Sequence, residues 1–222
     1  MRTGDESRLR AALRLQTQAL HAQVERSGVM QALLRGRLDR TAYSALLRNL
    51  HAVYGPLEAA LARHAAHPRL APLALPGLAR EQALADDLAV LHGACWQGEL
   101  AVHAAAQAYA RRLRELDATA PGLLLAHAYV RYLGDLSGGQ ILRRIVAGQL
   151  GIEGADGVHF YDFGNPDGAS ALARRFRAGL DAVPIDDAGI AEQVAEAQWS
   201  FTLHGRLFEE IQAAGAHAVP DA

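Results

Sequence analysis

Apolar residues recur three and four positions apart along most of the chain, the spacing that predicts amphipathic helices. Alternating runs of valine, isoleucine and threonine, which would indicate strands, are missing, while alanine, leucine, arginine and glutamate dominate. The first helix is expected to begin after Asp5 or Ser7 and to end at Gly28. Later helices are expected at about residues 39–61, 80–92, 100–116, 121–150, 169–182 and 187–214.

The segments between the predicted helices have the composition of loops. Three prolines fall within residues 67–77, and residues 151–168 are rich in glycine, aspartate and proline. No internal repeat, low-complexity run or linker divides the chain. We therefore expect an all-α protein with a single domain over residues 1–222 and an ordered core over about residues 7–214.

Three glycines interrupt the longest predicted helix at positions 134, 138 and 139. Each costs about 1 kcal/mol relative to alanine inside a helix, so their presence requires a compensating use. Gly134 and Gly138 are four residues apart and share a face without side chains, against which a flat ligand could lie. Asp135 stands beside this face and could anchor ordered water. From the spacing alone, a helix end or close packing of two helices on a Gly-x-x-x-Gly pattern is the more ordinary explanation.

One of the ten histidines has the surroundings of a metal ligand. His21 lies on the inner side of the first predicted helix, and Glu25 follows one turn later, where its carboxylate could orient the imidazole. An ordinary surface pair with the same spacing is the alternative. The chain has no Glu-x-x-His, Cys-x-x-Cys, His-Glu-x-x-His, Gly-x-Ser-x-Gly or P-loop motif, so di-iron, thiolate-metal, esterase and nucleotide chemistry are not predicted.

Composition narrows the partners and the compartment. A formal net charge of −2 argues against nucleic acid. Cys95 is the only cysteine, which excludes an intramolecular disulfide and fits a reducing cytoplasm. The N-terminal residues lack the apolar core of a signal peptide, and no apolar run approaches the roughly 20 residues of a membrane helix. We expect a cytoplasmic protein that does not bind membranes.

Five segments carry a family resemblance. Residues 127–140, HAYVRYLGDLSGGQ, resemble the distal-helix signature of the biliverdin-forming heme oxygenases of animals and bacteria. Residues 17–25, TQALHAQVE, resemble the proximal-helix motif, and residues 50–58, LHAVYGPLE, resemble the helix after it. Residues 84–88 and 207–211 also fall where the family has similar segments. The resemblance covers almost the whole chain and implies heme bound between a proximal N-terminal helix and a glycine-kinked distal helix.

The resemblance also implies roles for individual residues. His21 matches the histidine that ligates heme iron, and Glu25 matches the acid that supports it. Asp135 matches the aspartate that holds distal water for oxygen activation, with Tyr54 and Arg131 in the same hydrogen-bond network. The other matched positions contact the porphyrin as distal backbone, propionate partners or apolar walls: Gly134, Gly138, Gly139, Arg14, Tyr129, Arg177, Phe201 and Phe208.

The sequence departs from the family pattern at three positions. Gln18 and Ala173 stand where relatives often have basic residues, so propionate binding is expected to depend more on Arg14 and Arg177. His204 stands where relatives often have asparagine, which leaves its role in the distal pocket open.

The implied reaction opens heme b, which is cofactor and substrate, to biliverdin, CO and ferrous iron, with α-type cleavage giving the IXα isomer. It consumes O2 and electrons. Because the chain has no flavin or iron–sulfur motif, a reductase or ferredoxin must act as external electron donor, docking on a basic face near the heme edge. A biliverdin acceptor such as a phytochrome is a further possible partner.

Two other classes of protein remain open at this stage. A heme carrier or sensor would keep His21 but would not need Asp135. A helical relative acting on another small molecule, such as a thiamin-degrading enzyme, would need a reactive nucleophile. Cys95 is the only thiol, and its sequence neighbours offer no activating base.

Overall fold

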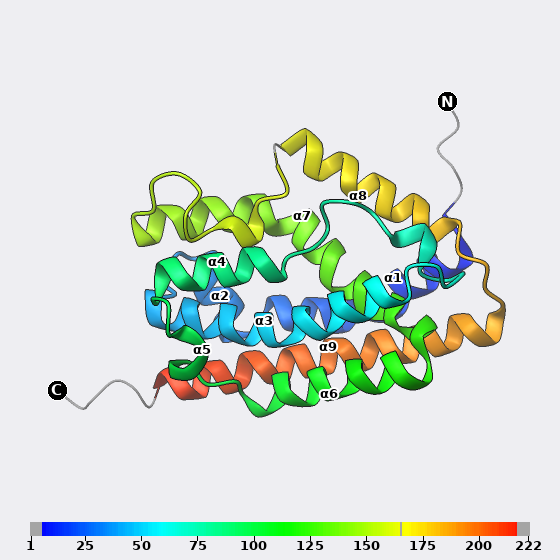
Figure 1. Ribbon diagram of the computed structural model, residues 1–222, viewed down its shortest axis with the longest axis horizontal. Coiled ribbons are helices and arrows are strands. Elements are labelled where there is room, and N and C mark those ends of the chain that lie inside the picture. The colour runs from blue at the N-terminus through cyan, green and yellow to red at the C-terminus, as the bar shows by residue number, and fades with distance from the viewer. Residues whose placement is uncertain (1–5, 165, 217–222) are drawn as a thin grey trace.

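The regular elements of the protein are helices throughout the part of the chain that its computed structural model describes, residues 6–164 and 166–216 (Figure 1). This confirms the all-α prediction. The α-helices are α1 (Arg8–Glu25), α2 (Gly28–Leu34), α3 (Arg40–Arg63), α4 (Glu81–Leu91), α5 (Trp96–Glu99), α6 (Ala104–Thr119), α7 (Leu124–Leu150), α8 (Pro166–Asp181) and α9 (Asp187–Ala216). Three short 3₁₀ turns are η1 (Ala71–Leu73), η2 (Pro121–Leu123) and η3 (His159–Tyr161).

The long helices pack around one hydrophobic core. α3, α6 and α9 run along the long axis of the molecule, and α8 crosses the opposite edge (Figure 1). α1 packs on α9, α3 packs on α4 and α6, and α7 packs on both α8 and α9. The centre of the core includes the fully buried side chains of Tyr43, Leu47 and Leu57 from α3. None of the described helices is long and apolar enough to cross a membrane.

Side-chain caps begin two helices where the sequence predicts them. The Oγ atom of Ser7 accepts a hydrogen bond from the Arg10 amide at 3.2 Å and starts α1. Asp39 accepts one from the Ala42 amide at 2.8 Å and starts α3. Each cap satisfies an amide that would otherwise lack a partner at the first turn of a helix.

The chain between α1 and α3 differs from the prediction. α1 ends at Glu25, and Ser27 caps a further helix, α2, that begins at Gly28 rather than ending there. Gly28 faces the end of the flexible, exposed Gln212 side chain of α9, and α2 packs on α9. α2 has only seven residues, too few for a periodic pattern to predict.

α7 runs through its glycines without a break, which corrects the expectation that they interrupt it. None of Gly134, Gly138 and Gly139 has a positive φ. The helix changes direction along its length (Figure 1). It ends at Gly151, whose left-handed conformation, with φ of 64°, suits a glycine C-cap.

The predicted irregular segment 151–168 contains a buried turn, η3, that α4 holds in place. Asp87 is fully buried and accepts hydrogen bonds at 2.8 Å from the amides of His159 and Phe160. These contacts place the buried rings of Phe160 and Tyr161 beside α7. The turn could not be predicted because its anchor lies 72 residues earlier in the chain.

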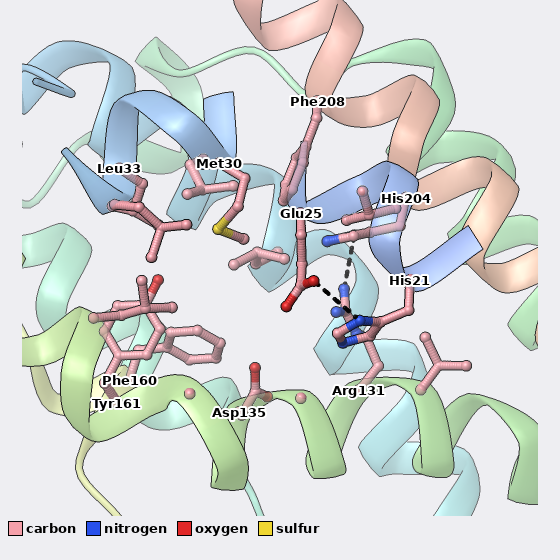
Figure 2. Close-up of a pocket in the computed structure, with 18 of the residues that line it drawn as sticks. His21, Glu25, Met30, Leu33, Arg131, Asp135, Phe160, Tyr161, His204 and Phe208 are labelled. Atoms are coloured by element: carbon pink, nitrogen blue, oxygen red, sulfur yellow. Dashed lines mark hydrogen bonds and ion pairs between the residues drawn. The ribbon is translucent and has the colours of Figure 1, made fainter. Parts of the chain in front are cut away.

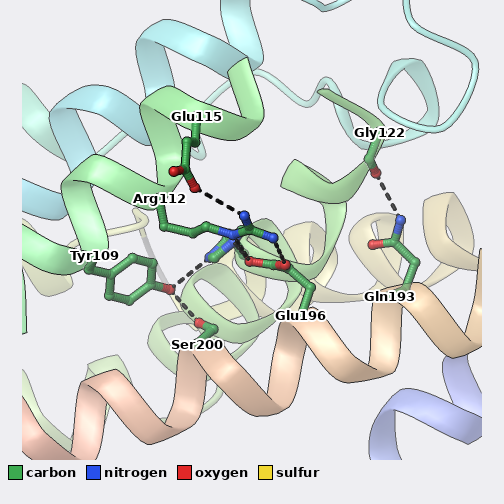
Figure 3. A network of polar contacts seen from close by, with 8 residues as sticks. Tyr109, Arg112, Glu115, Gly122, Gln193, Glu196 and Ser200 are labelled. Carbon is green, nitrogen blue, oxygen red and sulfur yellow. Dashed lines mark hydrogen bonds and ion pairs between the residues drawn. The ribbon is translucent and has the colours of Figure 1, made fainter. Parts of the chain in front are cut away.

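A buried polar network ties α6 and α7 to α9 (Figure 3). His127 has no exposed surface, and its Nε2 atom lies 3.0 Å from a carboxylate oxygen of Glu196. Arg112 donates to both oxygens of the same carboxylate, at 3.0 and 2.7 Å. The Tyr109 hydroxyl joins His127 to Ser200. Because these buried groups of His127, Glu196, Tyr109 and Ser200 have partners, the network stabilises the packing of the three helices.

Candidate functional site

A cleft between α1 and α7 consists of two adjoining cavities. The inner cavity has a volume of about 290 Å³ and is mostly apolar, while the outer cavity has about 550 Å³ and opens toward the ends of α1 and α8. Both are lined by His21, Glu25, Val130, Gly134, Gly138 and Phe201, so they form one continuous space. Its size is that of sites that bind cofactor-sized molecules.

The α1 wall of the cleft presents an imidazole. His21 has a half-exposed side chain, and its Nδ1 atom lies 3.5 Å from Oε2 of Glu25. The Phe201 ring packs edge-on against the imidazole with centroids 5.9 Å apart. Glu25 and Phe201 therefore restrict the orientation of the ring, as second partners do for metal-binding histidines.

The α7 wall opposite has no side chains at its centre. A Cβ atom placed on Gly134 or Gly138 would meet no other atom within 4 Å, so neither glycine is needed for packing against the protein. Both open directly onto the cleft. This excludes close helix packing as the reason for the two glycines and leaves a bare backbone surface that a flat ligand can approach.

Asp135 projects from α7 into the inner cavity, on the far side from His21 and Glu25 (Figure 2). The buried hydroxyl of Tyr54 donates a hydrogen bond to its carboxylate. Burial raises the pKa of Asp135 from 3.8 to about 6, although the nearby positive charge of Arg131 opposes the rise. A carboxyl with a pKa near neutrality can both accept and release protons at physiological pH.

Arg131 and His204 form the inner wall behind Asp135. Arg131 is 7% exposed, His204 is 5% exposed, and an Arg131 guanidinium nitrogen lies 2.8 Å from Nδ1 of His204 (Figure 2). The His204 ring packs on Phe208 with centroids 4.2 Å apart. Burial, reinforced by the charge of Arg131, places the pKa of His204 well below its usual value, so the imidazole is neutral.

Cationic side chains gather at the mouth of the outer cavity. Arg10, Arg14 and Arg177 line it together with Tyr129 and Gln18. Within residues 6–164 and 166–216, Arg177 makes no ion pair or hydrogen bond and remains available to an anionic ligand. The mouth thus suits a ligand with carboxylate groups.

Most residues proposed from the sequence meet at this cleft. The inner cavity is lined by His21, Glu25, Arg131, Gly134, Asp135, Gly138, Phe201 and Phe208, and the outer cavity adds Arg14, Tyr129 and Arg177. Tyr54 lies behind the wall and acts through Asp135. Gly139 departs from the expectation that its backbone faces the ligand: its Cβ direction points at Tyr161, 3.5 Å away, and it lines neither cavity.

Several lining residues were not predicted. α2 contributes Met30, Leu33 and Leu34, and η3 contributes Phe160 and Tyr161. α2 has apolar residues three and four positions apart, but its seven residues are too few for this spacing to indicate a helix. Glu6 at the mouth gave no signal, because its contact depends on the path of the chain before α1.

The fold and the cleft define a helical protein that binds a flat, anionic molecule carrying a metal for a single imidazole. Porphyrin iron fits this description: the bare glycine surface admits the ring, the apolar walls cover it, and the arginines face its carboxylates. Within the described residues no cluster of three or more His, Cys, Asp or Glu side chains could hold a metal ion.

Comparisons with known proteins agree. A family model described as heme oxygenase matches residues 7–210. Heme oxygenase 1 of the cyanobacterium Synechocystis is 37% identical over 204 residues, which span 92% of this chain and 85% of the relative. A crystal structure of heme oxygenase-1 from Synechocystis in complex with heme has a TM-score of 0.85 at 36% identity and covers 94% of this chain and 96% of that one. The structure of heme oxygenase from Leptospira interrogans has a TM-score of 0.86 at 33% identity, covering 91% and 98%.

The chain belongs to the heme oxygenase family. It is an enzyme that uses O2 and reducing equivalents to cleave heme, its cofactor and substrate, to biliverdin, CO and iron.

Proposed function

We propose that the cleft between α1 and α7 is where this chain carries out that reaction, with α-type cleavage giving biliverdin IXα. The observation that supports the site is the juxtaposition of His21 with the bare backbone of Gly134 and Gly138 across one continuous space. When bound, heme supplies both the iron that activates O2 and the ring carbon that is oxidised.

His21 would bind the iron through its imidazole, and Glu25 would hold that ring in place. The 3.5 Å separation between Nδ1 of His21 and the Glu25 carboxylate leaves Nε2 as the nitrogen for the metal. Heme held by a single histidine, as in globins, would bring O2-binding iron to this cleft. The absence of side chains at Gly134 and Gly138 would let a flat ring lie directly against the α7 backbone, across the cleft from His21.

Asp135 would move protons in the inner cavity. Its carboxyl receives the hydrogen bond of Tyr54, and its pKa of about 6 lets it exchange protons with water near neutral pH. Arg131, with its guanidinium held against His204, supplies a fixed positive charge to the same wall. These groups lie on the α7 side of the cleft, where protons are needed.

The mouth would fix the orientation of the ring. Arg177 is free to pair with a propionate, and Arg14 and Tyr129 line the same opening. Gln18 is uncharged, and Ala173 is buried, so neither contributes the positive charge that relatives often have there. Phe201 and Phe208 close the apolar sides.

Electrons would come from a separate protein, a reductase or ferredoxin, docking on a basic face near the heme edge. A phytochrome or similar acceptor would take biliverdin. We further propose that the enzyme acts in the cytoplasm.

Reconstitution with hemin tests the function. The protein should bind one hemin with a visible spectrum typical of histidine ligation. Addition of a reductase–ferredoxin pair under air should replace the heme absorbance with that of biliverdin, and chromatography should identify the IXα isomer. His21→Ala should change the spectrum and abolish turnover. Stable reduced heme in air without biliverdin would instead indicate a carrier or sensor, and an unchanged spectrum in His21→Ala would refute the ligand assignment.

A further inference from the structure

Arg14, one of the arginines that line the cleft mouth, already has a carboxylate partner. Nε of Arg14 donates to one oxygen of Glu6 at 3.1 Å, and a terminal guanidinium nitrogen donates to the other oxygen at 2.9 Å. This is the paired geometry in which a guanidinium binds a carboxylate, the same chemical group as a heme propionate. Glu6 itself lines the outer cavity.

The position of Glu6 is fixed by its neighbours. The amide of Ser7 donates to Asp181 at the end of α8 at 2.9 Å, and the Ser7 side chain caps α1. Arg10 donates to the same Asp181 oxygen at 2.8 Å and lies 3.8 Å from Glu6. Helical side chains lean toward the N-terminus of their helix, so Arg14 reaches back to the carboxylate at its start. Glu6 is therefore held over the mouth by α1 and α8 together.

The two arginines expected to bind propionates thus differ. Arg177 has no ion pair within the described part of the chain, whereas Arg14 donates both of its hydrogen bonds to Glu6. The hydrogen bond from Arg14 holds the pKa of Glu6 below its usual value, so the competing carboxylate is ionised at neutral pH. A propionate can reach the same face of Arg14 only by displacing Glu6.

We propose that Glu6 is an affinity-determining residue of the porphyrin site, a carboxylate built into the chain that competes with a substrate propionate for Arg14. This inference rests on the proposed function. Because biliverdin keeps both propionates, the same competition weakens the hold on the product and speeds its release. Arg177 then provides the stronger anchor, and Arg14 provides an exchangeable one.

Hemin titration of Glu6→Gln tests the proposal. The variant keeps the backbone amides that anchor Ser7 but presents no carboxylate to Arg14, so the hemin dissociation constant should fall about two- to fivefold, the range of exposed ion pairs. Biliverdin should dissociate more slowly by a similar factor. Glu192→Gln is the matched control, since it also removes one negative charge from an exposed pair, with Arg69, but lines neither cavity.

Two further titrations test whether Arg14 and a heme propionate cause the gain in affinity. The gain should disappear in an Arg14→Gln background and with hemin dimethyl ester, which carries no free carboxylate. Equal hemin affinity of Glu6→Gln and the unaltered protein would overturn the proposal, as would the same gain in Glu192→Gln or with the ester. Failure of the unaltered protein to bind hemin at all would instead overturn the proposed function, so the two failures are distinguishable.

Discussion

Arg131 determines which nitrogen of His204 carries the proton. A guanidinium only donates hydrogen bonds, so the contact of 2.8 Å requires Nδ1 of His204 to accept and places the proton on Nε2. Nε2 of His204 has no hydrogen-bond partner among the described residues, and it is not among the fully buried polar atoms. Because His204 lines the inner cavity, this N–H group can donate a hydrogen bond there. The chain therefore presents a neutral N–H group to the inner cavity.

The His204 side chain should be replaceable by an amide but not by a hydrocarbon. In His204→Asn the amide oxygen can accept from Arg131, whereas His204→Leu removes this acceptor from a buried charge. We expect His204→Leu to lower the free energy of unfolding of the heme-free protein by about 2–3 kcal/mol, and His204→Asn by less than about 1 kcal/mol. Urea unfolding measures both. Equal losses would show that the contact with Arg131 does not stabilise the fold, and nitrogen NMR shifts of the unaltered protein should report the Nε2–H tautomer.

Asp135→Asn should separate binding from catalysis. The amide has nearly the same shape but cannot exchange protons, so biliverdin formation should fall by a factor of about 10² or more, the contribution of a positioned acid–base group. The hemin dissociation constant should change less than about threefold. Spectral titration measures the hemin dissociation constant, and a single-turnover assay measures the rate of biliverdin formation. Normal turnover by the variant would show that Asp135 does not move the protons.

The same variant should stabilise the heme-free protein at high pH. The pKa of Asp135 rises to about 6 on folding, so its contribution to stability is fully present below about pH 4 and is lost as the pH rises through 6. Allowing for screening by water in the cleft, Asp135→Asn should be more stable than the unaltered protein by about 1–2 kcal/mol at pH 8 and by nearly nothing at pH 4. Urea unfolding at the two pH values checks this. A difference that does not change with pH would contradict it.

Gly138→Ala should stabilise the fold and weaken the site. Because a Cβ there meets nothing within 4 Å, the heme-free protein should gain about 0.5–1 kcal/mol, while hemin binding should weaken about tenfold as the methyl group enters the cleft. Gly148→Ala is the control: it lies in the same helix with the same free space but lines neither cavity. It should give the stability gain without the loss of affinity. Equal hemin affinity in both variants would refute the role of the glycine face.

Glu196→Gln should unfold more easily than the unaltered protein without a change in hemin affinity. Burial would raise the pKa of Glu196, but hydrogen bonds from His127 and Arg112 outweigh it and lower the pKa to about 2. Its stabilisation is therefore present above pH 4.5 and is lost as the pH falls toward 2. At pH 7 the loss should be about 2–3 kcal/mol by urea unfolding. Glu115→Gln, which removes the exposed partner of the same arginine, should cost less than about 0.5 kcal/mol.

The sequence predicts what depends on local spacing. Ser7 and Asp39 were identifiable as caps because they directly precede long periodic runs. His21 with Glu25, and Gly134 with Gly138, were identifiable because a separation of four residues places two positions on one helix face.

What the sequence could not predict depends on contacts between distant segments. Asp87 anchors η3 from 72 residues earlier in the chain, and no local sequence pattern predicts that contact. Gly139 looks equivalent to Gly138 in sequence. Because each successive residue of an α-helix is rotated by about 100°, Gly139 faces Tyr161 instead of the cleft. Ser7 caps α1, which decides between the two caps proposed for the first helix. Residues 1–5 and 217–222 lie outside the described residues, so the ends of the 1–222 domain stay a prediction.

The two unpacked glycines of α7 have a consequence for the abundance of the protein. They give the part of α7 that lines the cleft a weaker helical preference, whereas a ligand at a thousand times its dissociation constant adds about 4 kcal/mol to stability. Proteases that cut transiently opened chains would then remove empty molecules faster than loaded ones. A cell starved of substrate would hold little of this enzyme, and its half-life would lengthen as substrate accumulates.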